Sequence, residues 1–365
     1  MEESLDFDDV LIKPTRTTIE SRSEANLEVN FTGWKHATLD WSGIPICSSN
    51  SHHVGVFPVA RMVTANKMLS IIRKDEPFQD WKMAVQSMDA NYLCPTIGIE
   101  DNQKQIDSLR QILALSKDFK FICVDAENGY QLKMINTIKK LRSVLPNKII
   151  IAGNVCTPEG VSALLDAGAD IVKLGSSQKT RSITGVGCSQ FSTIVLCSAT
   201  AAASGGYIMS DAGFSSPADI TKALGAGAHF VCVTDMFNGH EECDGVTIER
   251  TYRTGEMIGE NETLVAKKLK AYYAPVPSDS FEIPYRGLVS ETVNFLKESL
   301  QDACAMVNCR FLKNLPRHVS FVRTTTKQPK IDLTNIQFER KITSVGVLDK
   351  CCNHQFPSNY KEGNQ

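Results

Sequence analysis

Short apolar runs alternate with stretches of helical periodicity along most of the chain. The apolar runs lie at residues 43–50, 68–74, 92–98, 119–129, 148–155, 169–177, 206–213 and 229–237. Each run is apolar on both faces, which is typical of a buried parallel strand. Between them, segments such as IDSLRQILALSKDF and LKMINTIKKLRSVLP repeat apolar residues at helical spacing. Two helical stretches end in glycine, LLDAGAD at 164–170 and ALGAGAH at 223–229, which closes a helix before the next strand.

Eight repeated strand–helix units predict a closed (β/α)8 barrel, an α/β fold of the TIM-barrel type. In such a barrel, functional side chains stand where the strands end. Here those ends read SSNSHH, RKDE, DAENGY, AGNV, LGSSQKTRS, SDAG and TDMFNGHEE. The sequence therefore predicts one polar rim that carries the chemistry.

The chain beyond the eighth run predicts three further parts. Residues 238–287 are polar and have no clear period, which indicates a long irregular lid. A helix over 288–306 is expected to close the barrel. Residues 326–365 are polar and predict a C-terminal tail, which leaves residues 1–325 as the barrel domain with 238–287 as its lid region.

The composition of the chain limits the kinds of partner that we expect it to bind. With 365 residues, 22% charged residues and a net charge of -2, the chain suits one large barrel and gives no sign of a nucleic-acid partner. It contains no apolar run of about 18 residues, so no membrane partner is expected. The acidic start MEESLDFDDV has no apolar signal region, which predicts a cytoplasmic location. The twelve cysteines show no paired spacing and are expected to be reduced core thiols, Cys304 and Cys309 included.

Several strings resemble GMP reductase of the IMP dehydrogenase / GMP reductase family. They are LDFDDVLIKPTRTTIESRSE, FICVDAENGY, IAGNV, GADIVKLG, TGVG, MFNGHEE and FLKNLPRHVSFVR, in the family's order over about residues 5–325. The resemblance implies a tetramer that binds a nucleoside 5'-monophosphate at the rim and stacks a nicotinamide cofactor, NADPH, over it. It also implies a cysteine thiolate, on the loop after the sixth strand, that attacks C2 of the purine before ammonia leaves and hydride arrives. A threonine and a glutamate would handle protons, and the same loop would hold a monovalent cation.

The chain departs from the family at that loop. Residues Gly175 to Gly187 contain no cysteine, and the loop is shorter than the family's by about four residues. We therefore expect the nucleophile and the cation site to be lost. The remaining catalytic candidates are Cys188, where the family has an aromatic residue, and Thr180.

The expected phosphate grip is also altered. The family's Ser-Asp-Gly-Gly is Ser210-Asp211-Ala212-Gly213 here, and its Gly-Gly before Met-Phe is Thr234-Asp235. A carboxylate at about 4 Å from a phosphate repels it by about 4 kcal/mol per unit charge at an effective dielectric constant near 20. The lid segment Gly-Met-Ser-Ser is replaced by residues 256–259. The substrate-side positions implied by the resemblance are Asp211, Ala212, Gly213, Thr234, Asp235 and Met257.

Cofactor-side positions of the family survive better, at Ser21, Arg22, Lys74, Asp125, Ala126 and Glu127. Each has a structural alternative: Asp125 could cap the next helix, and Arg22 and Lys74 could be solvated charges or tetramer salt bridges. The rim also carries His52, His53, Asp235, His240 and Glu241, which together could suggest a metal. Their spacing is no known ligand pattern, so a polar rim without metal is the preferred interpretation.

Three functional hypotheses follow. The first is a divergent GMP-reductase-like barrel that has lost the reaction and acts as a non-catalytic or regulatory homologue, as a homo-tetramer or in a hetero-oligomer with an active relative. The second is an NAD(P)H-dependent oxidoreductase acting on a purine-like or other small molecule without a 5'-phosphate. The third is an ordinary GMP reductase with a rearranged site.

Overall fold

Eight parallel strands close into a barrel in the computed structural model, which describes residues 4–100, 102–176, 178–211, 213–258, 261–272 and 280–324. The strands are β3 (Trp41–Ser48), β4 (Met68–Ile72), β5 (Leu93–Ile97), β6 (Phe121–Asp125), β7 (Ile149–Val155), β8 (Ile171–Leu174), β9 (Tyr207–Asp211) and β10 (Phe230–Val233). They pair in chain order, and β10 returns to β3 with Val231 opposite Ile46. The predicted (β/α)8 barrel is confirmed, and each predicted apolar run overlaps one of these strands, although β3 begins at Trp41, before its predicted start.

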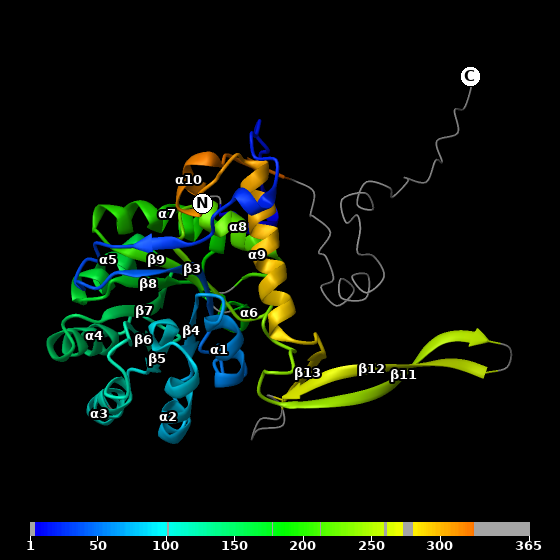
Figure 1. Cartoon of the computed structure of the whole chain (residues 1–365), viewed down its shortest axis with the longest axis horizontal. Helices are drawn as coiled ribbons and strands as arrows, with labels where there is room; N and C mark the ends of the chain where they lie inside the picture. Colours follow the sequence, from blue (N-terminus) through cyan, green and yellow to red (C-terminus); the bar gives the residue numbers. More distant parts are fainter. Residues whose placement is uncertain are drawn as a thin grey trace. The chain divides into compact units, whose positions relative to one another are not determined.

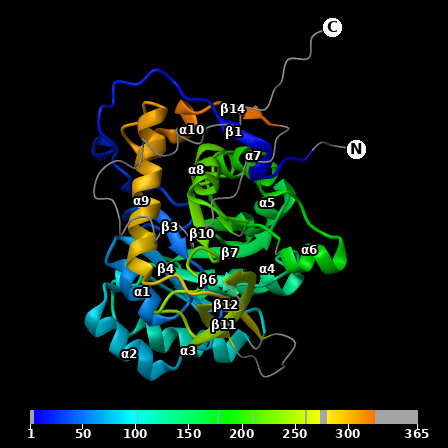
Figure 2. The ribbon, with the colours of Figure 1, turned by 90° about the vertical axis from the view of Figure 1, so that its right-hand side faces the viewer.

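Helices surround the barrel in both views (Figure 1, Figure 2). They are α1 (Phe57–Thr64), α2 (Phe78–Ser87), α3 (Asn102–Leu113), α4 (Leu132–Val144), α5 (Pro158–Ala167), α6 (Gln178–Thr184), α7 (Gln190–Ala203), α8 (Pro217–Gly225) and α9 (Val289–Met306). Local sequence sets their ends. The Thr157 hydroxyl accepts a hydrogen bond from the Gly160 N–H to start α5, and Gly168 ends it with φ of 124°. The predicted closing helix is α9.

The amino end of the barrel is sealed by aromatic side chains. Strand β2 (Val29–Phe31) pairs antiparallel with β3 and places Phe31 on Phe230, with ring centroids 4.3 Å apart. Trp34 packs edge-on against Tyr207 at 4.8 Å. Because Tyr207 and Phe230 are the first residues of their strands, this cluster forms the floor of the barrel. The carboxyl ends of the strands are left to form the mouth.

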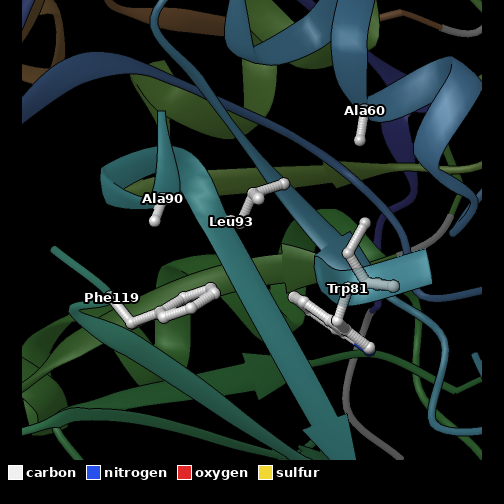
Figure 3. Packing of buried hydrophobic residues seen from close by; sticks show 6 residues of the cluster. Ala60, Trp81, Ala90, Leu93 and Phe119 are labelled. Atoms are coloured by element: carbon white, nitrogen blue, oxygen red, sulfur yellow. The ribbon is translucent and has the colours of Figure 1, made fainter. Parts of the chain in front are cut away.

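A second apolar layer lies between the barrel and its outer helices. Trp81 of α2 packs against Phe119, with centroids 5.8 Å apart, and Leu93 opens β5 beside them (Figure 3). Trp81 is only 2% exposed. Burial of such large side chains supplies much of the free energy that holds helices to a sheet.

Much of the lid region that is described forms regular strands, contrary to the irregular segment that we expected over 238–287. Strands β11 (Val246–Ile258) and β12 (Asn261–Tyr272) form an antiparallel ribbon, and β13 (Phe281–Pro284) pairs with the base of β12 (Figure 1). The β-branched run Val246-Thr247-Ile248 favours a strand. Its charged neighbours Glu249 and Arg250 hid that signal, because they interrupt the hydrophobic alternation that identifies a strand.

Short elements near the start and the end of the barrel unit, Met1–Lys330, pair with each other. Strand β1 (Val10–Ile12) pairs with β14 (Phe321–Arg323), and helix α10 (Leu315–His318) precedes β14. In the part of the chain that is described, no helix has the length and apolar character needed to span a membrane. The expected tail, 326–365, lies outside the described residues.

Candidate active site

The barrel mouth contains a polar cavity of about 260 Å³, called the mouth pocket here. It is built from the carboxyl ends of six strands. Its lining residues are Ser49, Asn50, Ser51, Asp125, Ala126, Glu127, Asn154, Lys173, Gly175, Asp211 and Thr234. The site therefore lies where the fold class places it.

A buried lysine organises this pocket. Lys173 of β8 is 1% exposed, and its Nζ lies 2.6 Å from Oδ1 of Asp125 and 3.0 Å from Oδ2 of Asp211. It also donates to Oδ1 of Asn50 at 3.3 Å. Burial alone would lower the pKa of Lys173, but the two carboxylates outweigh it and hold that pKa well above its ordinary value. The ammonium is therefore charged and structural rather than nucleophilic.

The carboxylates around Lys173 are its salt-bridge partners. Burial tends to raise the pKa of Asp125, but Lys173 reverses this, and the net pKa is lowered. Asn154 Nδ2 donates to Oδ2 of Asp211 at 2.8 Å, which fixes that carboxylate from a second strand end. Glu127 is a third acidic residue in the lining, beside Asp125 and Asp211, whereas Lys173 is the lysine among the described lining residues.

Sequence reasoning found Asp125 and Asp211 but missed Lys173, Asn154 and Asn50 as site residues. A signal for Lys173 was present in the run ADIVKLG, because a lysine inside a strand that is buried on both faces requires anionic partners. The partners themselves lie on strands far apart in the sequence.

A larger cavity of about 660 Å³, the side groove, continues from the mouth pocket. The two share Asp125, Ala126, Glu127, Asn154 and Gly175. The remaining lining residues are Lys74, Gly98, Ile99, Glu100, Gln105, Asn128, Tyr130, Gln131, Cys156, Ser176, Thr184, Val186 and Gly187. Four of the expected cofactor-side residues, Lys74, Asp125, Ala126 and Glu127, are thus brought together here.

Ser21 and Arg22 lie elsewhere. Ser21 caps a short 3-10 helix, and Arg22 pairs with Asp302 of α9 at 3.0 Å and with Glu298 at 3.5 Å. Neither residue is among the described residues that line the mouth pocket or the side groove. The structural alternative raised for Arg22, a salt bridge, is realised within the chain.

The structure places some of the expected substrate-side residues in the mouth pocket and others outside it. Thr234 and Asp211 line the mouth pocket, whereas Asp235 is absent from its described lining. The Asp235 carbonyl accepts a hydrogen bond from Arg286 Nη1 at 2.7 Å. Burial raises the pKa of Asp235, and Arg286 opposes that shift. Gly213 has φ of 85°, a conformation that glycine adopts without strain. Ala212 and the side chain of Met257 lie outside the described residues.

The barrel thiols are poor candidates for a nucleophile at the mouth. Cys47, Cys94, Cys123 and Cys232 are buried in the strands, and burial raises the pKa of Cys123 to about 12. Cysteine is absent from the described lining of the mouth pocket. Cys188 is partly exposed and follows Gly187. The side chain of Thr180 in α6 lies outside the described residues.

The rim histidines do not converge with the rim carboxylates on a metal. Over the described ranges, no group of three His, Cys, Asp or Glu side chains could hold a metal ion. His52 faces Asp75 at 3.6 Å, and the ring of His53 packs on Tyr272 at 4.1 Å. His240 is fully buried; its Nδ1 donates to the Phe237 carbonyl at 2.9 Å, and its Nε2 accepts from the Thr292 hydroxyl at 2.7 Å.

Two buried histidines predict acid sensitivity. Burial lowers the pKa of His229 and of His240 from 6.5 to about 4. Below pH 6.5 these histidines therefore bind protons in the unfolded chain but stay neutral in the folded chain. The free energy of unfolding falls as the pH is lowered toward about 4. From pH 6.5 to pH 5 we expect each histidine to remove about 2 kcal/mol from the free energy of unfolding.

Urea unfolding measured across this pH range tests the expectation. The variants His240→Asn and His229→Gln should each have a shallower pH dependence than the parent chain. An unchanged dependence in both variants would show that other groups control the acid response.

The fold and the site together define a TIM-barrel protein whose functional groups gather at the strand carboxyl ends. Comparison with known proteins identifies the family within this fold class. A model of the IMP dehydrogenase / GMP reductase domain matches residues 4–330. The chain is 37% identical to GMP reductase of Serratia proteamaculans (strain 568) over 336 residues, which covers 90% of this chain and 96% of that protein. It is 36% identical, with the same coverage, to GMP reductases of Yersinia enterocolitica and Yersinia pestis (strain Pestoides F). The chain therefore belongs to the IMP dehydrogenase / GMP reductase family.

Proposed function

We propose that this chain does not reduce GMP with NADPH and instead serves as a non-catalytic or regulatory homologue of GMP reductase. One observation carries the proposal: the described lining of the mouth pocket holds carboxylates, amides and Lys173, but no thiol. A covalent adduct with a purine needs a group that attacks as an anion and leaves again, which is why a thiolate suits it.

Electrostatics support the same conclusion. Asp125, Glu127 and Asp211 outnumber Lys173 in the pocket lining. A phosphate dianion placed among them meets repulsion of about 4 kcal/mol per unit charge at about 4 Å and an effective dielectric constant near 20. Carboxylates accept hydrogen bonds, so this lining can bind the hydroxyl groups of a ligand better than it can bind phosphate oxygens. Loss of the family's monovalent cation site is part of this proposal.

The side groove fits a nicotinamide cofactor better than the mouth pocket fits a nucleotide. Its volume of about 660 Å³ lies within the range of ordinary ligand sites. Lys74 Nζ lies 3.8 Å from the position that a Cβ at Gly98 would occupy, so this cation stands beside the Gly98 backbone in the groove. Lys74 would pair with a phosphate, and Asp125 and Glu127 would accept hydrogen bonds from ribose hydroxyls. NADPH, when bound, supplies hydride.

The direct test is an assay with GMP and NADPH, followed through the absorbance of the reduced nicotinamide. We expect a rate equal to that of NADPH without protein, because none of the described residues that line the mouth pocket carries a thiol that could form the purine adduct. GMP reductase of Serratia proteamaculans, assayed in parallel, is the positive control. GMP-dependent oxidation of NADPH by this chain would overturn the proposal and favour an ordinary GMP reductase with a rearranged site.

A second candidate function is reduction of a purine-like or other small molecule that lacks a 5'-phosphate. It is favoured by the continuity of groove and mouth pocket through Asp125, Ala126 and Glu127. A thermal-shift panel of nucleotides, nucleosides and dinucleotides separates the candidates. Stabilisation by NADPH together with a nucleoside supports the second function, whereas a regulatory homologue would be identified by co-purification with an active GMP reductase. Assembly as a homo-tetramer or hetero-oligomer, and a cytoplasmic location, remain predictions.

A further inference from the structure

Two cysteines that the proposed function does not use lie on neighbouring segments: Cys156 lines the side groove, and Cys188 follows the lining residue Gly187. Cys156 directly follows β7, and Cys188 lies between α6 and α7. The backbone brings these segments together. The Gly175 N–H donates to the Val155 carbonyl at 3.1 Å, so the chain leaving β8 runs beside the residue before Cys156.

The next residues continue this contact toward Cys188. Ser176 Oγ lies 2.6 Å from the position that a Cβ on Gly187 would occupy, so the residue before Cys188 packs against the same segment. Cys156, Ser176 and Gly187 line one groove. Burial raises the pKa of Cys156, the nearby Cys188 thiol adds to this shift, and the Ser176 side chain opposes it.

Access distinguishes this pair from the other thiols of the barrel unit. Cys156 and Cys188 are both partly exposed, whereas the eight other cysteines described in the structure are buried. Cys304 and Cys309 also contact each other, but each is fully buried. A small oxidant in solution can therefore reach the groove pair and is shielded from the second pair.

We propose that Cys156 and Cys188 form a reversible disulfide that fastens the segment from Gly175 to Cys188 to the end of β7. This segment forms one wall of the side groove, and Arg181 already holds it by donating to the Cys188 carbonyl at 3.3 Å. The bond adds a covalent link between the end of β7 and this wall of the groove. The inference does not rest on the proposed function, because bond formation needs no ligand in the groove.

The reaction is thiol–disulfide exchange with a small disulfide such as oxidised glutathione. The Cys188 thiolate attacks one sulfur of the small disulfide, forms a mixed disulfide and expels one small thiolate. Cys156 then loses its proton to solvent and attacks the Cys188 sulfur, which expels the second thiolate. The protein dithiol is oxidised and the small disulfide is reduced to two thiols. We assign the first attack to Cys188 because burial, followed by the Cys188 thiol, raises the pKa of Cys156.

The test uses the full chain, equilibrated in glutathione buffers from reducing to oxidising, then trapped with acid and alkylated. Peptide mass mapping should find a Cys156–Cys188 linkage that rises with oxidation and disappears with dithiothreitol. Hydrogen exchange of the backbone amides in residues 181–188 should slow several-fold in the oxidised chain. The variant Cys156→Ser should accumulate glutathione on Cys188, because the second attack is missing.

Matched variants decide between this pair and its neighbours. Cys188→Ser should abolish the linkage, and Cys309→Ser should leave it unchanged. Absence of a Cys156–Cys188 peptide under the most oxidising buffer, or linkage of Cys188 only to Cys197, would refute the proposal. An active GMP reduction in the absorbance assay would leave this inference standing, so the two proposals fail separately.

Discussion

Replacing Lys173 by methionine is expected to lower the free energy of unfolding by about 3 kcal/mol. The methionine keeps the length and packing of the side chain but removes the ammonium that lies between Asp125 and Asp211. Two carboxylates then face each other at the barrel mouth without a cation. We take the lower part of the usual range because the Asp125 side chain is 33% exposed and solvent screens part of the repulsion.

The pH dependence of this loss gives a second measurement. The folded-state pKa of Asp125 lies below 3.8, so the ion pair stabilises the parent chain above that pH and is lost as pH falls through the folded value. The difference between parent and variant should therefore shrink below about pH 3.8. Chemical denaturation of both chains at neutral and acidic pH measures it.

Lys67→Met is the matched control. Lys67 also pairs with a carboxylate, Glu28 at 2.7 Å, but both side chains are about half exposed. Exposed pairs of this kind contribute about 0–1 kcal/mol. Equal losses for the two variants would show that burial of the Lys173 cluster does not control its energetic role.

The second large effect is expected at Asp170, whose carboxylate is fully buried behind the barrel wall. Its Oδ1 accepts from the backbone N–H groups of His36 at 2.8 Å and Ala37 at 3.1 Å. Its Oδ2 accepts from the Ile150 N–H at 3.0 Å and from Arg142 Nη2 at 2.5 Å. One residue thus joins the segment before β3 to β7 and α4.

The substitution Asp170→Asn should cost about 3–5 kcal/mol in the free energy of unfolding. The amide keeps the shape of the carboxylate but can accept at only one of the two atoms. Its NH2 group is therefore left facing two donors, either Arg142 and the Ile150 N–H or the His36 and Ala37 N–H groups. Thermal and urea unfolding measure the loss. Asp166→Asn is the control, because Asp166 is 68% exposed and pairs with Lys35 on the surface. A loss below about 1 kcal/mol at Asp170 would contradict the network's role.

The sequence alone determined the architecture. Eight apolar runs with helical stretches between them allow few arrangements other than a parallel barrel, because strands buried on both faces need helices outside and packed side chains inside. The same pattern placed the polar residues on one rim, since parallel strands end at the same side. Asp125 and Asp211 were therefore identifiable before any coordinates. The family followed from the order of the motifs.

Only the tertiary structure decided which rim residues meet. Lys173 contacts Asp125 and Asp211 because β6, β8 and β9 curve around one axis, and no sequence spacing encodes that approach. The tertiary structure also places Arg22 away from the groove, in a salt bridge with Asp302, and buries His240 against Thr292 of α9. The ribbon of β11 and β12 was missed because cross-strand pairing, which the sequence pattern does not report, defines it. Periodicity reports burial against a core, whereas contacts between side chains on different strands depend on closure of the barrel.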